Sequence, residues 1–250
     1  MDLEKDDLTQ HISRQYNEDL EQIRTNVLNM GGLVEKHLGD ALRALLEQDS
    51  KLADEVALSD YLVNNLEVEI DEECTRVLVR RQPAAGDLRV VIMIIKTITD
   101  LERVGDQAKR IAKFAANLDD GSATRRFQSE IANMAERVRK MLRGALDAFA
   151  RLDTDLAYEI ACMEPKVDRE FENLTRLLMT YMMEDPRSIK WTVQIMWAAR
   201  SMERISDYCQ NICEYVIYMV KGKDVRHTSL ESIEKEIHED RHLGRNPEGG

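Results

Sequence analysis

The chain has 250 residues, of which 43% are hydrophobic and 33% charged, and its formal net charge at pH 7 is −12. This size and composition are typical of a folded globular protein with one large core or two small ones. The acidic balance argues against nucleic acid as the main partner, since phosphate backbones bind basic surfaces. The longest apolar run, at 90–95, is too short to cross a bilayer, so we expect no direct membrane insertion. The N-terminus MDLEKDD lacks the apolar stretch of a secretory signal, so the cytoplasm is the expected compartment.

The first half of the chain is predicted to form three long helices. The chain has only 4 Pro and 11 Gly and shows no sustained alternation of apolar and polar residues, so helices are favoured over strands. We predict helices over 8–56 with a kink near Asp49, over 60–81 and over 88–117. Pro83 and Gly86 separate the last two helices, and Asp87 is a suitable N-cap for the third. These elements form a first predicted unit at residues 8–118.

The second half repeats this plan. A linker at 119–122 precedes predicted helices over 123–160, 164–183 and 187–221. Asp185 is a suitable N-cap, Pro186 suits a first helical turn, and Gly222 is a stop signal. These helices form a second predicted unit at 123–222, followed by a polar tail at 223–250 that we expect to be largely flexible apart from a short amphipathic segment around Ile233. The predicted fold is therefore all-α, with six long helices in two tandem three-helix bundles.

The two units are related in sequence as well as in plan. ALRALLEQDSKLADEV at 41–56 aligns with ALDAFARLDTDLAYEI at 145–160, at an offset of 104 residues. LERVGD at 101–106 aligns with MERISD at 202–207, at an offset of 101 residues. The difference between the two offsets implies a three-residue insertion in the first unit near residues 60–64. One duplicated unit of about a hundred residues explains both matches.

Acidic residues spaced four apart recur at matched places on the predicted helices. This spacing puts both side chains on one helix face, where like charges destabilise a helix by about 0.2–0.5 kcal/mol. On a helical wheel Glu102 and Asp106 lie at the edge of the apolar face around Ile98, and not on the fully solvated side. The four pairs are Glu67 with Asp71, Glu102 with Asp106, Asp168 with Glu172, and Glu203 with Asp207. Asp60 and Asn64 share the helix edge of the first pair, and Glu164 lies near the place of Asp60 in the second unit.

Two explanations of these pairs remain open. If the second and third helices of each unit are neighbours, several carboxylates meet along each seam and need protons, arginines or a metal ion to neutralise them. Oxygen ligands without His or Cys suit hard cations such as Mg²⁺, Mn²⁺, Ca²⁺ or oxidised iron, in single or multinuclear form. The other explanation is a set of ordinary surface salt bridges, because cations follow Asp106 in the first unit. The matched positions of the two units are Lys109 and Gln210, Arg110 and Asn211, and Lys113 and Glu214. The second unit thus keeps the acids and loses these cations.

Longer stretches around the acidic pairs resemble the PhoU family, the accessory proteins of phosphate-specific transport. The resemblance is carried by GDLRVVIMIIKTITDLERVGDQAKRI, by its partner ARSMERISDYCQNI in the second unit, and by RRQPAAGDLR. It extends from residue 11 to about residue 228. It implies two similar three-helix bundles, each with an acidic signature that can bind metal clusters, with iron and zinc as reported metals.

The resemblance also implies a function and a set of ligands. The implied protein is a cytoplasmic, homodimeric negative regulator of the phosphate-starvation response. It acts between the ATPase subunit of the high-affinity phosphate ABC transporter and the phosphate-sensing histidine kinase. The implied motif residues are Glu102, Asp106, Glu203 and Asp207, with Glu67, Asp71, Asp168 and Glu172 as facing partners. Gly105 is replaced by Ser206 in the second motif, which changes the clearance beside the cluster, and whether the two sites have equal metal affinity stays open.

An enzyme is not the expected class, because the sequence offers no nucleophile with a base beside it and no phosphate-binding glycine loop. The alternatives that stay open are a carboxylate-bridged metalloenzyme and a metal-free helical scaffold.

Overall fold

The computed structural model describes residues 3–83, 85–118, 126–226, 228, 230, 232–235 and 237, with side chains from residue 15 onward. These residues are helical apart from short connections, and they contain no strand. The helices of the first unit are α1 (Leu3–Glu47), α2 (Ser50–Ser59), α3 (Tyr61–Arg81) and α4 (Ala85–Ala116). Those of the second unit are α6 (Gln128–Arg151), α7 (Thr154–Ala161), α8 (Glu164–Glu184), the 3₁₀ turn η1 (Pro186–Ser188) and α9 (Ile189–Lys221). The all-α prediction is confirmed, and the predicted linker at 119–122 lies outside the described residues.

The first long helix of each unit is interrupted at the same place. Gln48 and Leu152 both adopt a left-handed backbone, with φ of 60° and 52°. The hydrogen bonds that close the two helix ends run from the N–H of Asp49 to the carbonyl of Ala44 (3.1 Å) and from the N–H of Asp153 to the carbonyl of Ala148 (3.0 Å). This six-to-one bond is typical of a Schellman motif, which ends a helix. The kink predicted near Asp49 is therefore a full break, and the continuous helix predicted over 123–160 is wrong.

Each break is followed by an aspartate that starts the next helix. Asp49 Oδ1 accepts hydrogen bonds from the N–H groups of Lys51 (3.1 Å) and Leu52 (3.0 Å), and Asp153 Oδ1 accepts one from Leu156 (3.0 Å). These N-caps satisfy N–H groups that have no partner inside the helix. The two breaks lie 104 residues apart (152 − 48), which is the offset of the aligned segments. The structural repeat thus follows the sequence repeat.

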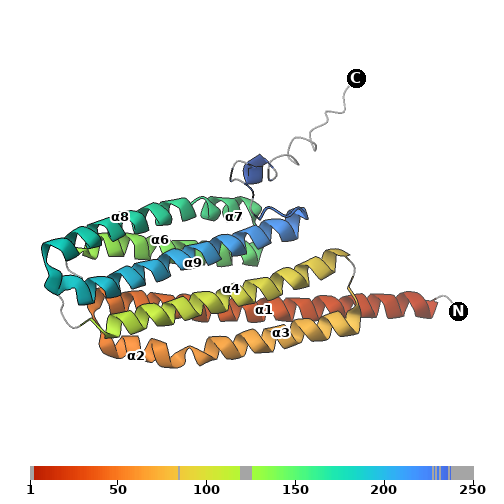
Figure 1. The fold of residues 1–250 in the computed structure, drawn as a ribbon. Coiled ribbons are helices and arrows are strands. Elements are labelled where there is room, and N and C mark those ends of the chain that lie inside the picture. Colours follow the sequence, from red (N-terminus) through yellow and green to blue (C-terminus); the bar gives the residue numbers. More distant parts are fainter. Residues whose placement is uncertain are drawn as a thin grey trace, which may run out of the picture.

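The two units lie side by side, with α4 of the first packed against α9 of the second (Figure 1). Each of these helices is also central in its own unit, since α4 contacts α1, α2 and α3, and α9 contacts α6, α7 and α8. The apolar face predicted around Ile98 is buried and includes Val91, Ile94 and Leu101. Burial of one side chain of this kind contributes about 1.5–3 kcal/mol. Helices α4 and α9 are therefore the centre of the fold.

The described part of the C-terminal segment packs against the second unit. Val225, Ile233 and Ile237 are buried, as the amphipathic pattern around Ile233 predicts. The Lys221 ammonium at the end of α9 donates a hydrogen bond to the carbonyl of Ile237 (3.3 Å). The rest of the predicted flexible tail, after residue 237, lies outside the described residues.

Candidate metal centre

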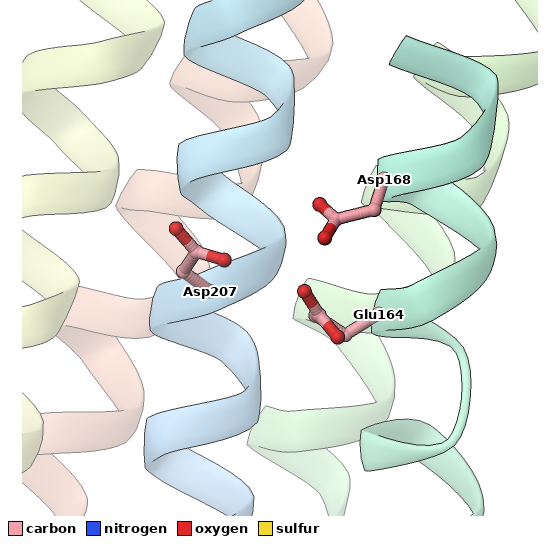
Figure 2. Close-up of side chains that lie close together, drawn as sticks. All are labelled: Glu164, Asp168 and Asp207. Carbon is pink, nitrogen blue, oxygen red and sulfur yellow. The ribbon is translucent and has the colours of Figure 1, made fainter. Parts of the chain in front are cut away.

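Three carboxylates of the second unit converge between α8 and α9 (Figure 2). Glu164 is the first residue of α8, Asp168 follows one turn later, and Asp207 comes from the middle of α9. Each residue offers one oxygen, and the three oxygens lie within 4.8 Å of one another. Helix α8 presents its two acids on one face because four residues make about one helical turn. Packing of α8 against α9 supplies the third.

Glu203 adds a fourth acidic side chain beside this group. It lies one turn before Asp207 on α9 and is 7% exposed. Its Oε1 accepts a hydrogen bond from Arg200, whereas its Oε2 is buried and has no hydrogen-bond donor. Oδ1 of Asp168 is also buried without a donor. Buried acceptors without donors are costly, and a cation among clustered carboxylates would satisfy them. The residues present therefore fit a hard metal ion.

The electrostatics of this group favour a neutralising partner. Burial raises the pKa of Glu164 to about 7, and the charges of Asp168 and Asp207 act in the same direction. Burial, followed by the charge of Asp207, raises the pKa of Glu203 to about 7. Burial also raises the pKa of Asp207, again with help from Asp168. Protons and a metal ion compete for such carboxylates, since a ligand must be deprotonated to bind. We call Glu164, Asp168, Glu203 and Asp207 the second-unit cluster.

The corresponding first-unit cluster consists of Asp60, Glu67, Glu102 and Asp106. Lys109 lies beside these four carboxylates. Burial raises the pKa of Glu102, and the charges of Asp106, Glu67 and Asp60 add to this shift. Lys109 Nζ donates a hydrogen bond to Asp60 Oδ2 at 2.7 Å, which is the main reason that the pKa of Lys109 lies above its usual value. Among the described residues of the first unit, no three metal-ligating atoms come as close together as those of the second-unit cluster.

Most of the ligands predicted from the sequence lie in one of the two clusters. Asp71, Glu172 and Asn64 are the others, and all three are exposed. Burial raises the pKa of Glu67, and the charge of neighbouring Asp71 contributes to this shift. Asp71 therefore acts on the first-unit cluster from its outer side.

Glu164 is the member of the second-unit cluster that the sequence comparison did not single out as a ligand. At the offset of 101 that relates Glu67 to Asp168, Glu164 matches Val63, which is apolar and fully buried. A Cβ added to Gly105 would lie 3.3 Å from Val63 Cγ1, so the first unit fills this place by apolar packing. The signal available in the sequence is the four-residue spacing between Glu164 and Asp168.

Comparison with known proteins gives the family of the chain. A family model described as the PhoU domain matches it twice, at residues 27–115 and 131–216, which together exceed half of its length. The chain belongs to the PhoU family. One PhoU repeat falls in each of the two units, so the clusters are corresponding features of duplicated PhoU domains.

Relatives match the PhoU chain over nearly its whole length. The phosphate-specific transport system accessory protein PhoU homolog of Pseudomonas putida is 50% identical over 94% of this chain and 92% of its own. The phosphate-specific transport system accessory protein PhoU of Escherichia coli K12 is 47% identical over 91% of this chain and 94% of its own. The crystal structure of PhoU from Pseudomonas aeruginosa superposes with a TM-score of 0.81 at 49% identity, covering 83% of this chain and 100% of that one. The PhoU structure from Streptococcus pneumoniae gives 0.79 at 29% identity, covering 84% and 99%.

Proposed function

We propose that this PhoU-family chain is a cytoplasmic accessory protein of phosphate-specific transport that restrains the phosphate-starvation response and phosphate uptake. The observation that carries the proposal is its identity of 47–50% to phosphate-transport accessory proteins over more than nine tenths of the chain. Both PhoU repeats are present and contain the acidic residues of the two clusters. The similarity therefore covers both domains, and it supports a proposal about the function of the whole protein rather than of one domain.

The proposed partners are the ATPase subunit of the phosphate ABC transporter and the phosphate-sensing histidine kinase, and the protein acts as a homodimer between them. Its net charge of −12 favours association with basic patches on other proteins. No helix in the described part of the chain is long and apolar enough to cross a membrane. In this arrangement the partners recruit the protein to the inner face of the membrane.

We also propose that the second-unit cluster holds a metal ion. Glu164, Asp168, Glu203 and Asp207 would provide oxygen ligands, which suit Mg²⁺, Mn²⁺ or iron, with zinc as a further candidate. A bound cation supplies positive charge that attracts phosphate, whereas bare carboxylates repel it. The buried oxygens of Asp168 and Glu203 that lack donors support this proposal.

Deletion of the gene tests the regulatory part of the proposal. In phosphate-rich medium, we expect the deletion strain to express a phosphate-starvation reporter constitutively, and a plasmid copy of the chain to restore repression. A deletion strain that represses the reporter normally would remove the regulatory role.

Elemental analysis tests the metal part. The chain is purified without a histidine tag and its metal content is measured before and after dialysis against a chelator. We expect a bound metal that the chelator removes and that added Mn²⁺ or Fe²⁺ replaces. Protein that carries no metal and takes up none would favour the metal-free scaffold instead.

A further inference from the structure

Helices α4 and α9 run antiparallel along the seam between the two units, and three cation–aromatic contacts mark their register. Each contact joins a cation of α4 to a tyrosine ring of α9 at 5.7–5.9 Å from the ring centroid. The pairs are Arg89 with Tyr218, Lys96 with Tyr215, and Arg103 with Tyr208. The three cations are spaced seven residues apart, so they share one face of α4. Along this face a row of positive charge lies next to a row of aromatic rings.

The middle of the seam exposes arginine and aromatic side chains to solvent. The side chain of Arg103 is 52% exposed, and Trp197 is 51% exposed. Arg110 and Arg204 are also exposed. Arg110 continues the seven-residue spacing of α4, and Trp197, Arg204 and Tyr208 share one face of α9 because they are spaced seven and four residues apart. We call Arg103, Arg110, Trp197, Arg204 and Tyr208 the seam surface. Arg200 is not part of it, because its guanidinium lies 5.6 Å from the centroid of the Phe171 ring on α8.

Part of the positive charge on the seam surface is already neutralised within the chain. Arg103 pairs with buried Asp100 at 3.0 Å, and the charge of Arg204 opposes the rise in the pKa of Glu203 and Asp207. Neither Arg110 nor Arg204 forms an ion pair within 4.0 Å in the part of the chain that the structure describes. These two arginines lie on opposite sides of the seam, one on α4 and one on α9. Their guanidinium groups can therefore still form direct ion pairs with a binding partner.

Composition and charge indicate what this surface binds. Arg, Trp and Tyr are the residues most enriched at the centres of protein interfaces, where they carry most of the binding energy. The chain as a whole has a net charge of −12, so exposed cations gathered between two acidic clusters are a local exception. Acidic groups of a partner are attracted to the seam and repelled by Asp106 on one side and Asp207 on the other. This pattern restricts both the place and the orientation of docking.

We propose that the seam surface is a docking site for a partner protein that presents carboxylates to Arg110 and Arg204 and an apolar contact to Trp197. The inference rests on the proposed function, because the partner is one of the two proteins of the phosphate system named above. It goes beyond that function in assigning the contact to the α4–α9 seam and in giving the partner's segment an acidic character. The apolar contact gives affinity, and the paired charges fix the register.

The test measures binding of the purified ATPase subunit, and separately of the cytoplasmic part of the histidine kinase, to the full chain by isothermal titration. The seam variant combines Arg110→Glu with Arg204→Glu, and the control combines Lys51→Glu with Lys140→Glu, two exposed cations on α2 and α6. Both double variants change the net charge by the same amount. For at least one partner we expect the seam variant to weaken binding more than tenfold and the control less than twofold. Arg110→Lys with Arg204→Lys is expected to retain most of the affinity, and Trp197→Ala to lose part of it.

The outcomes separate this inference from the proposed function. If the wild-type chain binds neither protein, the proposed partnership fails and the inference fails with it. If the wild type binds but the seam variant binds equally well, the partnership stands and the seam surface is overturned.

A third arm uses vesicles of phosphatidylcholine with phosphatidylglycerol. Vesicle binding that the seam variant alone abolishes, with partner binding unchanged, would overturn the protein partner in favour of a membrane surface. Circular dichroism of each variant confirms that it is folded.

Discussion

The two acidic clusters occupy the same place in duplicated units, yet their charge is balanced differently. In the first, Lys109 donates to Asp60 at 2.7 Å and neutralises one carboxylate. The matching residue in the second is Gln210, whose side chain donates to Glu214 (2.9 Å). Each cluster has four carboxylates, and the fourth comes from Glu164 at the start of α8 in the second unit and from Asp60 directly before α3 in the first.

Arg200 offsets one charge of the second-unit cluster through Glu203, but buried oxygens of Glu203 and Asp168 remain without donors. In the first-unit cluster Asp60 Oδ1 is likewise buried without a donor, so the two clusters differ in the lysine beside the first and in the closer convergence of three carboxylates in the second. We expect the second-unit cluster to bind metal more tightly than the first.

The largest effect is expected from removal of the second-unit ligands. Asp168→Asn with Asp207→Asn should weaken Mn²⁺ binding about 100-fold or more, because two of the converging oxygens lose their charge. The matched variant in the first unit is Glu67→Gln with Asp106→Asn, and it should change the affinity less than tenfold. Isothermal titration of tag-free, chelator-treated protein measures both. Equal losses in the two variants would contradict the asymmetry.

Exchange of the residues that distinguish the clusters should move the metal affinity in opposite directions. Gln210→Lys places an ammonium group near the second-unit cluster, so we expect metal affinity there to fall about tenfold, which corresponds to about 1.4 kcal/mol. Lys109→Gln removes the cation beside the first-unit cluster. We expect this variant to raise the Mn²⁺ affinity of that cluster, or to show a second Mn²⁺ site in isothermal titration. If neither variant changes the Mn²⁺ affinity, a lysine beside a cluster does not control its metal occupancy.

The pH dependence of the free energy of unfolding tests whether the carboxylates of the second-unit cluster repel one another in the metal-free protein. The pKa of Glu164 and of Glu203 is about 7 in the folded chain and 4.5 ordinarily, so the folded state binds more protons between these values. Stability should therefore fall as the pH rises from about 4.5 through 7. Glu164→Gln with Glu203→Gln should flatten this decline, whereas Glu172→Gln on the exposed side of α8 should not. Thermal unfolding at pH 5.5 and 8.0, with and without Mn²⁺, measures the effect, and added metal should remove it.

The smallest effects concern features that the two units share. Asp49→Ala and Asp153→Ala each remove an N-cap after a helix break, at an expected cost of about 1 kcal/mol in the free energy of unfolding. Urea unfolding should give similar values for both, with exposed Asp54→Ala as a control that changes stability little. A large difference between the two caps would mean that the breaks are not equivalent parts of the repeat.

Local patterns in the sequence predicted the helices, the duplication and the spacing of the acidic pairs, because each depends on residues within a few turns of one another. The apolar face around Ile98 and the stop at Gly222, where φ is 74°, are also decided locally. The break at Leu152 was not predicted, since a leucine carries no signal for a left-handed backbone. Its signals were the aligned position of Gln48 and the N-cap residue Asp153 that follows it.

The sequence by itself determined that acidic side chains line matched edges of helices in two related units. Only the tertiary structure decided which of them meet. Glu164 joins Asp168 and Asp207 because α8 packs on α9, and Lys109 reaches Asp60 across 49 residues of chain. The physical reason is that carboxylates interact over a few ångströms in space, whereas helical periodicity fixes only the direction in which a side chain points. The packing of the buried apolar faces determines which helices become neighbours. It thereby also determines the balance of charge in each cluster.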